Sequence, residues 1–370
     1  MKFATLMGAV SLTALGTAAA AQDADLLVFE YSGFEDPAFH ADYIATHGDG
    51  PTFAFFGDED EAFPKIRAGF AADVTHICAG SVSKWTESGI IEPWDISKIP
   101  AYGDLDSNLT GTDIGDGATY FIPTDFGSTA IAYNPDDVPA ADVASLDVFK
   151  NPAYAGRVTL PDNVDDAYAL AYLATGVDNW TNATDAQFDA ASNWLREVHP
   201  NLRTYWTDPA ELAQLLSSGE ILVSWAWNET YPTMVEEDRP IAFQREAAEG
   251  SSLWLCGYVA MWLCGYVAMW LCGYVAMWLC GYVNMAEGQG SEDKAYDYIN
   301  AMLAETSVVP LLDAGYGSSN AAALTGVLTE EDLEAAGLGV IDVPVLAQLP
   351  MSNELRERQA ETFELIKAGF

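Results

Sequence analysis

The chain has 370 residues, of which 50% are hydrophobic and 12% aromatic, so it can bury a core sufficient for two domains. Its 55 acidic residues against 15 basic ones give a formal charge of −40. This composition excludes wholesale disorder, and it argues against binding to nucleic acid or to anionic lipid, both of which need a basic surface. Most of the acidic side chains are interpreted as a solubility device, and the excess is compatible with a cationic small ligand.

Residues 1–21 have the pattern of a secretory signal peptide. Lys2 is followed by an apolar run at 3–15 that is too short to span a bilayer, and small residues at 18–21 suit cleavage before Gln22. The mature protein is therefore expected in the periplasm, where disulfides are permitted.

Strand patterns and helix patterns then alternate along the chain. This order predicts an α/β fold with a mostly parallel sheet. The acidic run at 57–61 is interpreted as the start of a helix, because it lacks the turn glycine and distal glutamate of a calcium loop. The predicted strands cover 26–31, 52–56, 74–78, 119–123, 128–133, 157–160 and 221–227, and the predicted helices cover 37–46, 63–70, 166–175, 187–198, 295–303 and 355–367.

An octet, WLCGYVAM, starts at Trp254 and recurs at Trp262 and Trp270, and a fourth copy, WLCGYVNM, starts at Trp278. A period of eight turns by roughly 80° per copy on a helix but preserves both faces of a strand, so a strand is favoured over a membrane-spanning helix. Trp, Cys, Tyr and Ala or Asn would share one face. A recent duplication or an error in the gene record explains the literal identity, and one copy suffices for a buried strand before the helix at 295–303.

Signatures of common enzymes and metal sites do not occur in the sequence. The four histidines are not at ligand spacing, and C-x-x-C, G-x-S-x-G, P-loop and G-x-G-x-x-G motifs are missing. An enzyme that uses isolated carboxylates is the less favoured alternative, and we expect neither a metal nor a cofactor.

Aromatic and acidic residues recur where predicted strands end. In open α/β sheets ligands bind beyond these carboxyl ends, and aromatic faces with carboxylates suit an ammonium group. The alternative is that the aromatic residues belong to the core. The strand ends in question are 31–34, 78–81, 125–129, 162–166 and 225–229.

The order of several short motifs resembles the periplasmic solute-binding proteins of polyamine ABC transporters, the spermidine/putrescine-binding type. These motifs are VFEYSGFEDP, SGIIEPWD, IPTDFGSTAIAYNP, YAGRVTLPDN, LLSSGEILVSWAWNE, WLCGYVNM, GYGSSNAAA and FELIKAG. The resemblance implies a type II fold of two α/β lobes with mixed sheets flanked by helices, and a ligand in the cleft between the lobes. It implies a small cationic amine as ligand, an ABC importer permease as partner, and a monomer. The expected lobes are 22–131 with 253–322, which includes the repeat at 254–285, and 132–252 with 323–370.

The resemblance also implies a set of ligand-binding residues. Two carboxylates of the family are replaced here, by Asn163 and by the octet cysteine, and a serine is replaced by Cys78. Asp125 stands where the family has an apolar residue and could restore a charge, so the resemblance implies the amine class rather than spermidine in particular. The implied ligand-binding residues are Tyr31, Ser32, Phe34, Cys78, Asp125, Asn163, Asp166, Trp227, Asn228, Trp278 and Tyr316.

Cys78 and one octet cysteine fall on strands that the resemblance places side by side, so a disulfide is a candidate and two free thiols are the alternative. Either the first or the fourth copy could supply the strand. The fourth is favoured because it leads directly into the next helix, which makes Cys78 and Cys280 the expected pair.

Deleting residues 254–277 should leave a soluble, ligand-competent monomer, because one octet is enough for the strand and the surplus apolar copies promote aggregation. Size-exclusion chromatography and thiol alkylation with and without reductant would measure this. A deletion variant that fails to fold would show that the repeats are structural.

Overall fold

The computed structural model describes residues 22–105, 117–261, 291–329 and 343–370. The expected signal peptide, Trp278 and Cys280 lie outside these residues. Within them, no helix is both long and apolar enough to cross a membrane.

One sheet runs through the whole molecule, in the strand order β2-β1-β3-β10-β5-β8-β6-β7. Strand pairs at its two ends are parallel, as in βαβ units: β1 pairs with β2 and β3, and β6 pairs with β7 and β8. The principal strands are β1 (Gln22–Tyr31), β2 (Gly50–Phe56), β3 (Val74–Cys78), β5 (Phe121–Tyr133), β6 (Val158–Pro161), β7 (Leu202–Trp206), β8 (Val223–Trp227) and β10 (Ser251–Met261). The short strands β4 (Ile91–Glu92), β9 (Ala242–Gln244), β11 (Gly317–Ser318) and β12 (Val345–Ala347) pair with β5 or β10.

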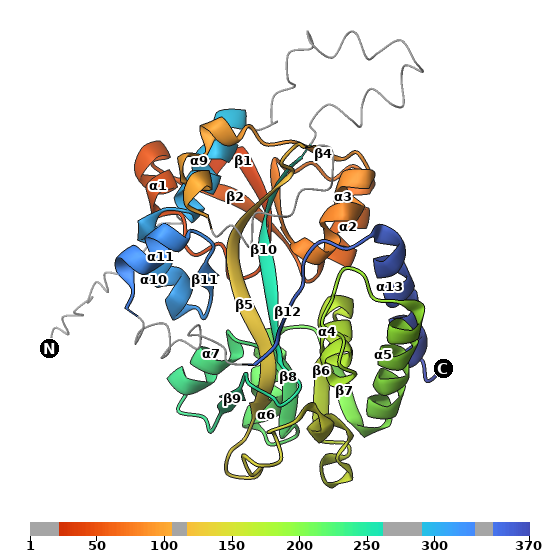
Figure 1. The fold of residues 1–370 in the computed structure, drawn as a ribbon. Helices are drawn as coiled ribbons and strands as arrows, with labels where there is room; N and C mark the ends of the chain where they lie inside the picture. Colours follow the sequence, from red (N-terminus) through yellow and green to blue (C-terminus); the bar gives the residue numbers. More distant parts are fainter. Residues whose placement is uncertain (1–21, 106–116, 262–290, 330–342) are drawn as a thin grey trace, which may run out of the picture.

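The two central strands, β5 and β10, are antiparallel to each other and run from one end of the molecule to the other (Figure 1). β10 is also antiparallel to β3, and β5 is antiparallel to β8. The expectation of a mostly parallel sheet is therefore correct within each end and wrong at the centre, where the chain passes between two lobes.

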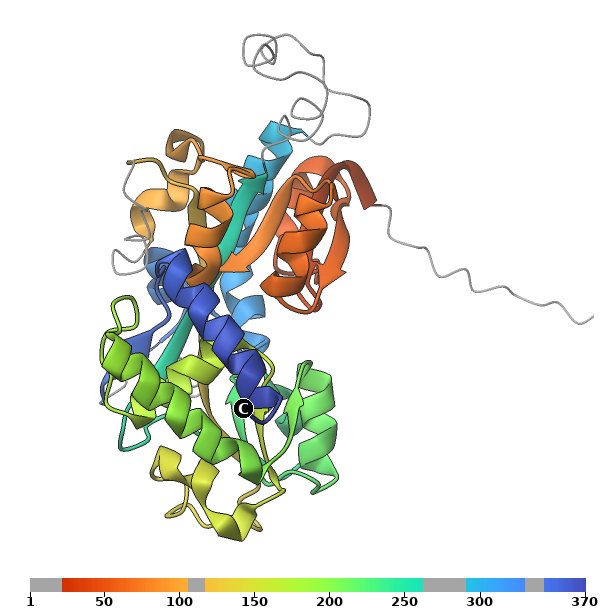
Figure 2. The same ribbon diagram turned by 90° about the vertical axis from the view of Figure 1, so that its right-hand side faces the viewer.

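Helices cover both faces of the sheet in each lobe (Figure 2). In the first lobe they are α1 (Ala41–His47), α2 (Glu59–Arg67), α3 (Val82–Glu87), α9 (Glu292–Met302), α10 (Glu305–Asp313) and α11 (Ala321–Val327). In the second they are α4 (Val164–Ala174), α5 (Asp185–Val198), α6 (Pro209–Ser217), α7 (Thr230–Glu236) and α13 (Asn353–Lys367).

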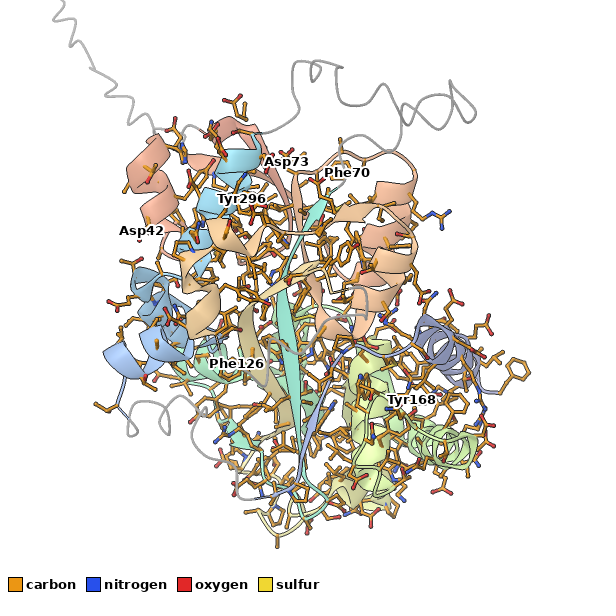
Figure 3. The ribbon with its side chains drawn as sticks, turned by 45° about the horizontal axis from the view of Figure 1, so that its top comes forward. Asp42, Phe70, Asp73, Phe126, Tyr168 and Tyr296 are labelled. Atoms are coloured by element: carbon orange, nitrogen blue, oxygen red, sulfur yellow. A yellow bond between two sulfur atoms is a disulfide. The ribbon has the colours of Figure 1, made fainter. Side chains whose placement is uncertain are left out.

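Separate hydrophobic cores lie on the two faces of each lobe. In the second lobe Tyr168 of α4, labelled in Figure 3, is fully buried and stacks on Phe188 of α5 with ring centroids 5.5 Å apart. Phe363 and Ile366 of α13 join that same core, so the C-terminal helix belongs to the second lobe. In the first lobe, Ala62, Phe63 and Ile66 of α2 pack against β1 and β3.

The first octet copy forms most of β10, not the fourth as expected. Its alternation is confirmed, because Tyr258 and Ala260 enter one core of the first lobe while Val259 and Met261 enter the other. The first copy continues directly from Ser251–Leu253, which pair with β5 and β12 in the second lobe, so this copy crosses between the lobes without a break.

Residues 121–133 form the single strand β5, rather than the two strands predicted at 119–123 and 128–133. Asp125, Phe126 and Gly127 fall between the two predicted strands, yet all three pair with β10, and Asp125 and Phe126 also pair with β11, which keeps the backbone extended through them.

Candidate ligand-binding site

A cavity of about 180 Å³ lies between the lobes, where the carboxyl ends of β1, β3, β6, β7 and β8 face one another. It is lined by Tyr31, Ser32, Phe34, Phe56, Gly57, Asp58, Glu59, His76, Cys78, Asp125, Asn163, Asp165, Asp166, Thr207, Asp208, Pro209, Trp227, Glu229, Trp254, Cys256, Tyr316 and Gln348. This is the edge at which α/β sheets bind ligands.

Local sequence explains why polar groups gather here. Asp58, Asn163 and Asp208 are the N-caps of α2, α4 and α6, and each side chain accepts a hydrogen bond from a backbone N–H of its own helix. Each helix follows a strand that ends at the cavity, so the capping residue is placed at the rim. The capping interpretation of the acidic run at 57–61 is confirmed, although the same run also contributes two carboxyl groups to the cavity.

The lining is strongly acidic. Seven of the lining residues are Asp or Glu, and none of the described residues in the lining is Lys or Arg. Two of the seven, Asp125 and Asp165, pair with His76 and Arg356. The other five have no ion pair among the described residues, and burying carboxylates in this way is costly, so a cation in the cavity would be stabilised.

Asp166 is buried at the second-lobe side and accepts hydrogen bonds from three neutral groups. The Thr129 hydroxyl donates at 2.7 Å, the Trp227 indole N–H at 2.6 Å and the Gln348 amide at 3.0 Å. Burial raises the pKa of Asp166 above its usual value, and these three hydrogen bonds oppose that shift. The carboxylate is therefore held in a fixed orientation with no cation among these three donors.

Glu229 follows Trp227 by two residues and is linked across the cavity to the first lobe. The Tyr316 hydroxyl donates a hydrogen bond to its Oε2 atom. Burial raises the pKa of Glu229 to about 7, and the Tyr316 hydroxyl partly counteracts this.

Asp58 and Glu59 form a second acidic group at the start of α2. Burial is the main cause that raises the pKa of Asp58 to about 6 and that of Glu59 to about 8, and repulsion from neighbouring carboxylates adds to it. Glu59 accepts the Cys78 backbone N–H at 2.7 Å, and Asp58 accepts the Asn163 amide at 3.0 Å.

Behind Asp125 lies a buried row of charges. The His76 Nδ1 atom is 2.6 Å from Glu30 and its Nε2 atom is 3.1 Å from Asp125. Burial lowers the pKa of His76, but the two carboxylates outweigh this effect and raise it to about 10. The imidazolium therefore holds Asp125 in place, while the buried Oδ2 atom of Asp125 has no hydrogen-bond partner among the described residues.

Aromatic rings form the remaining walls. Phe34 stacks on Tyr316 with centroids 4.9 Å apart, and Trp254 meets Tyr316 edge-on at 5.9 Å. Trp227 packs edge-on against Trp206 at 4.7 Å. Such faces attract cations.

A disulfide joins Cys78 and Cys256, which lie opposite each other on β3 and β10. The expectation of a disulfide from Cys78 to an octet cysteine is confirmed, but the partner is Cys256 of the first copy and not Cys280. The bond lies in the wall of the cavity. It links β10, which crosses the cleft, to β3 of the first lobe.

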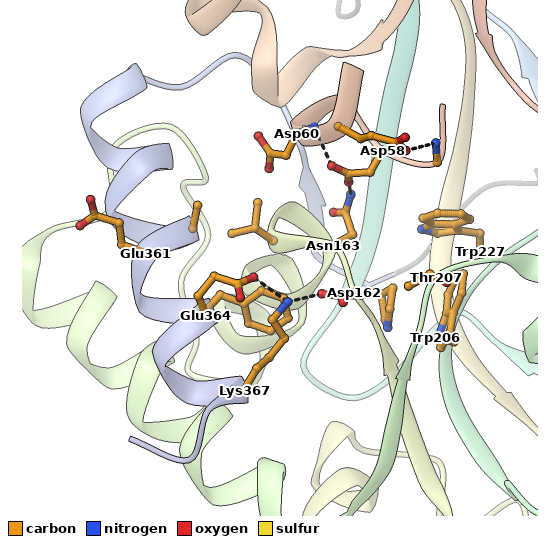
Figure 4. Close-up of a pocket in the computed structure, with 16 residues that line it drawn as sticks. Asp58, Asp60, Asp162, Asn163, Trp206, Thr207, Trp227, Glu361, Glu364 and Lys367 are labelled. Carbon is orange, nitrogen blue, oxygen red and sulfur yellow. Dashed lines mark hydrogen bonds and ion pairs between the residues drawn. The ribbon is translucent and has the colours of Figure 1, made fainter. Parts of the chain in front are cut away.

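A wider groove of about 590 Å³ opens beside the cavity and shares Gly57, Asp58, Asn163, Thr207 and Trp227 with it. Figure 4 shows this groove. Lys367 lies in it and pairs with Asp162 at 2.5 Å and with Glu364 at 2.6 Å. Its positive charge is thus already paired inside the groove.

Most residues predicted from the sequence meet in the cavity. Tyr31, Ser32, Phe34, Cys78, Asp125, Asn163, Asp166, Trp227 and Tyr316 line it, and Trp254 stands where an octet tryptophan was expected. Asn228 does not line it; its Oδ1 atom accepts the Ser128 backbone N–H at 3.1 Å and so links β8 to β5.

Several lining residues were not predicted. Glu229 was visible as the last residue of the WAWNE strand end, and Asp58 and Glu59 were assigned only to capping. His76 is the central residue of a predicted strand and carried no signal, because its partner Glu30 is on another strand.

Comparisons with known proteins agree with this architecture. Residues 41–336 match the profile of a family described as bacterial extracellular solute-binding protein. The spermidine/putrescine-binding periplasmic protein of Escherichia coli (strain K12) is 25% identical over 225 residues, which are 60% of this chain and 64% of that protein. The spermidine/putrescine-binding periplasmic protein 1 of Haemophilus influenzae is 28% identical over 177 residues, 47% of each chain. The chain thus spans less than two thirds of the length of these curated relatives.

Solved structures share the fold over nearly the whole chain. The substrate-binding protein PotD from Streptococcus pneumoniae, solved with calcium and HEPES, has a TM-score of 0.67 at 16% identity, covering 93% of this chain and 98% of that one. MotA from A. tumefaciens B6, solved with glucopine, has a TM-score of 0.68 at 16% identity, covering 93% and 99%. At these identities the likeness shows the fold, which is the expected two-lobed type II fold.

The buried ion pairs of His76 predict a pH-dependent stability. Because the pKa of His76 is about 10 in the folded chain and its usual value is 6.5, its contribution is complete below pH 6.5 and is lost as the pH rises to 10. His76→Asn should lower the free energy of unfolding by about 3–5 kcal/mol at pH 6.5. In this variant the free energy of unfolding should also decrease less steeply between pH 6.5 and pH 10. Urea unfolding at several pH values measures both effects.

His199→Asn is the matched control, since His199 hydrogen-bonds Tyr205 in the second lobe, away from Asp125. An equally steep fall in the His76→Asn variant and in the unsubstituted protein would contradict the assigned role of His76.

Proposed function

Because the chain belongs to the family of bacterial extracellular solute-binding proteins, we propose that it binds a small cationic amine of the polyamine type and delivers it to the permease of an ABC importer. The observation that carries this proposal is the cavity lining, which has seven carboxyl groups and no described lysine or arginine. The named binding proteins of E. coli and H. influenzae support the class of ligand.

Two kinds of contact would hold the ammonium groups. The carboxylates of Asp166 and Glu229 lie near the Trp227 and Tyr316 side chains, and the free Oδ2 atom of Asp125 supplies an acceptor. Charge-assisted hydrogen bonds from ammonium to carboxylate would combine with cation–π attraction from the rings. The aliphatic part of the ligand would lie along Phe34 and Trp254.

The proposed mechanism is closure of the lobes around the ligand. The lobes, 22–131 with 253–322 and 132–252 with 323–370, would rotate about the two strands that cross between them, β5 and β10. A ligand that contacts both lobes favours the closed state only through its better contacts there. The role is that of an exported, monomeric binding protein of the periplasm, which returns its ligand unchanged, rather than that of an enzyme.

Calorimetric titration tests the proposal with putrescine, spermidine, cadaverine, amino acids and guanidino compounds. Saturable binding of at least one amine is expected, together with unchanged ligand on recovery. Binding of none of the amines, or conversion of any of them, would contradict the proposal.

Asp166→Asn should weaken binding of the best amine by about 1.5–3 kcal/mol, because the variant loses a charge-assisted hydrogen bond while the amide oxygen still accepts from its neighbours. Calorimetry measures the change in affinity. Asp178→Asn, at an exposed position after α4, is the control and should bind like the unsubstituted protein. Equal affinities for both variants would contradict the role of Asp166.

The affinity should also depend on pH through Glu229. Since its pKa is raised to about 7, the carboxylate is half ionised near neutrality, and an ammonium ligand favours the ionised form. The amine affinity should therefore rise from pH 6 to 8. Glu229→Gln should remove the part of this rise that is centred near pH 7, and what remains would come from Asp58 and Glu59. An identical pH profile in the variant would show that Glu229 does not face the ligand.

A further inference from the structure

Arg356 is a buried cation outside the cavity lining. It lies on α13, where its side chain is 3% exposed. Its Nη1 atom donates to Asp60 at 3.0 Å, and its Nε and Nη2 atoms both donate to the Oδ2 atom of Asp165 at 3.3 Å. One guanidinium group therefore joins two carboxylates.

These two carboxylates come from different lobes. Asp60 is in the first turn of α2, whose apolar residues belong to the core around β1 and β3. Asp165 is on α4 in the second lobe, and α13 packs into the same core as α4. The bridge from Arg356 to Asp60 thus crosses the cleft, whereas the bridge to Asp165 stays within one lobe.

The lobes meet closely at this place. The Asn163 amide donates across the cleft to Asp58 at 3.0 Å, and both residues are labelled in Figure 4. A Cβ atom added at Gly80 of the first lobe would lie 2.8 Å from the Oδ2 atom of Asp165. Asp60 is at the rim, with its side chain 38% exposed, and also binds Lys84 of its own lobe at 2.6 Å.

Opening the cleft would break the Arg356–Asp60 pair and leave the Arg356–Asp165 pair intact. We propose that Arg356 is a positioning residue that latches the two lobes through Asp60 and raises the population of the closed state before a ligand arrives. The inference rests on the proposed function for its effect on affinity. The apparent affinity is the affinity of the closed state multiplied by the fraction of the protein that is closed. The latch therefore raises the apparent affinity for every ligand by the same factor.

Asp60→Asn tests the latch, because it weakens the bridge that crosses the cleft and the Lys84 pair, and leaves the Arg356–Asp165 pair in place. Lys84→Gln is the matched control, since it removes the other partner of Asp60 within the first lobe. Affinity for putrescine and for spermidine is measured by calorimetry, and the radius of gyration of the ligand-free protein by small-angle scattering. Asp60→Asn should lower the affinity for both amines by one common factor, on the order of tenfold, and should increase the radius of gyration of the ligand-free protein. Lys84→Gln should change neither the affinities nor the radius of gyration.

Gly80→Ala is a second variant that keeps every charge and places a methyl group against Asp165. It should lower the affinity for both amines by an equal factor and should increase the radius of gyration of the ligand-free protein in the same way. A loss in Asp60→Asn that grows with the charge of the ligand would overturn the latch, because Asp60 would then act directly on the amine. Unchanged scattering and affinity in both variants would also overturn it.

The two proposals fail differently. If the unsubstituted protein binds no amine, the proposed function is wrong, and the scattering of the free proteins still decides the latch. If amines bind and Asp60→Asn leaves the free protein equally compact, the latch is wrong and the proposed function stands.

Discussion

The antiparallel pairing of β5 with β10 is the constraint on which the rest of the structure depends. Each lobe has its own parallel strands and its own cores, and these two strands are members of both. The position of the site follows from this pairing, because Asp125 and Trp254 lie within the two crossing strands and line the cavity. The extended residues of β5 and β10 thus both connect the two lobes and form part of the cavity wall.

The second constraint is the cost of burying so many carboxyl groups. The chain meets it in three ways: capping of helices by Asp58 and Asp208, internal cations at His76 and Arg356, and protonation, which the raised pKa values of Glu59 and Glu229 indicate. Only the last of these can be reversed by a ligand. A cation that enters the cavity replaces bound protons, so ligand affinity and pH are linked there.

Sequence patterns predicted the parts that depend on local order. Alternating faces of the octet, the strand at 74–78 and the helix starting near Asp166 follow from periodicity. Eight of the cavity residues implied by the resemblance also lie at predicted strand ends, whereas Tyr316 was expected from the resemblance alone. Contacts between distant segments were not predictable in this way. His76 needs Glu30 and Asp125, and Arg356 needs Asp60 and Asp165, and no spacing in the sequence relates these partners. The choice among the octet copies likewise depended on pairing with β5 and β12.

The disulfide and Asp125 are best understood together. The resemblance places a carboxylate where Cys256 stands, and the cysteine cannot carry that charge once it is bonded to Cys78. In the sheet Cys256 is directly opposite Asp125 on β5, so a carboxylate one strand away lies at the same level of the cavity wall. The two oxygen atoms of the Asp125 carboxylate have different surroundings. His76 pairs with Oδ1, while Oδ2 has no hydrogen-bond partner among the described residues. The wall therefore keeps an acceptor atom at this level, but its negative charge is partly offset by the imidazolium.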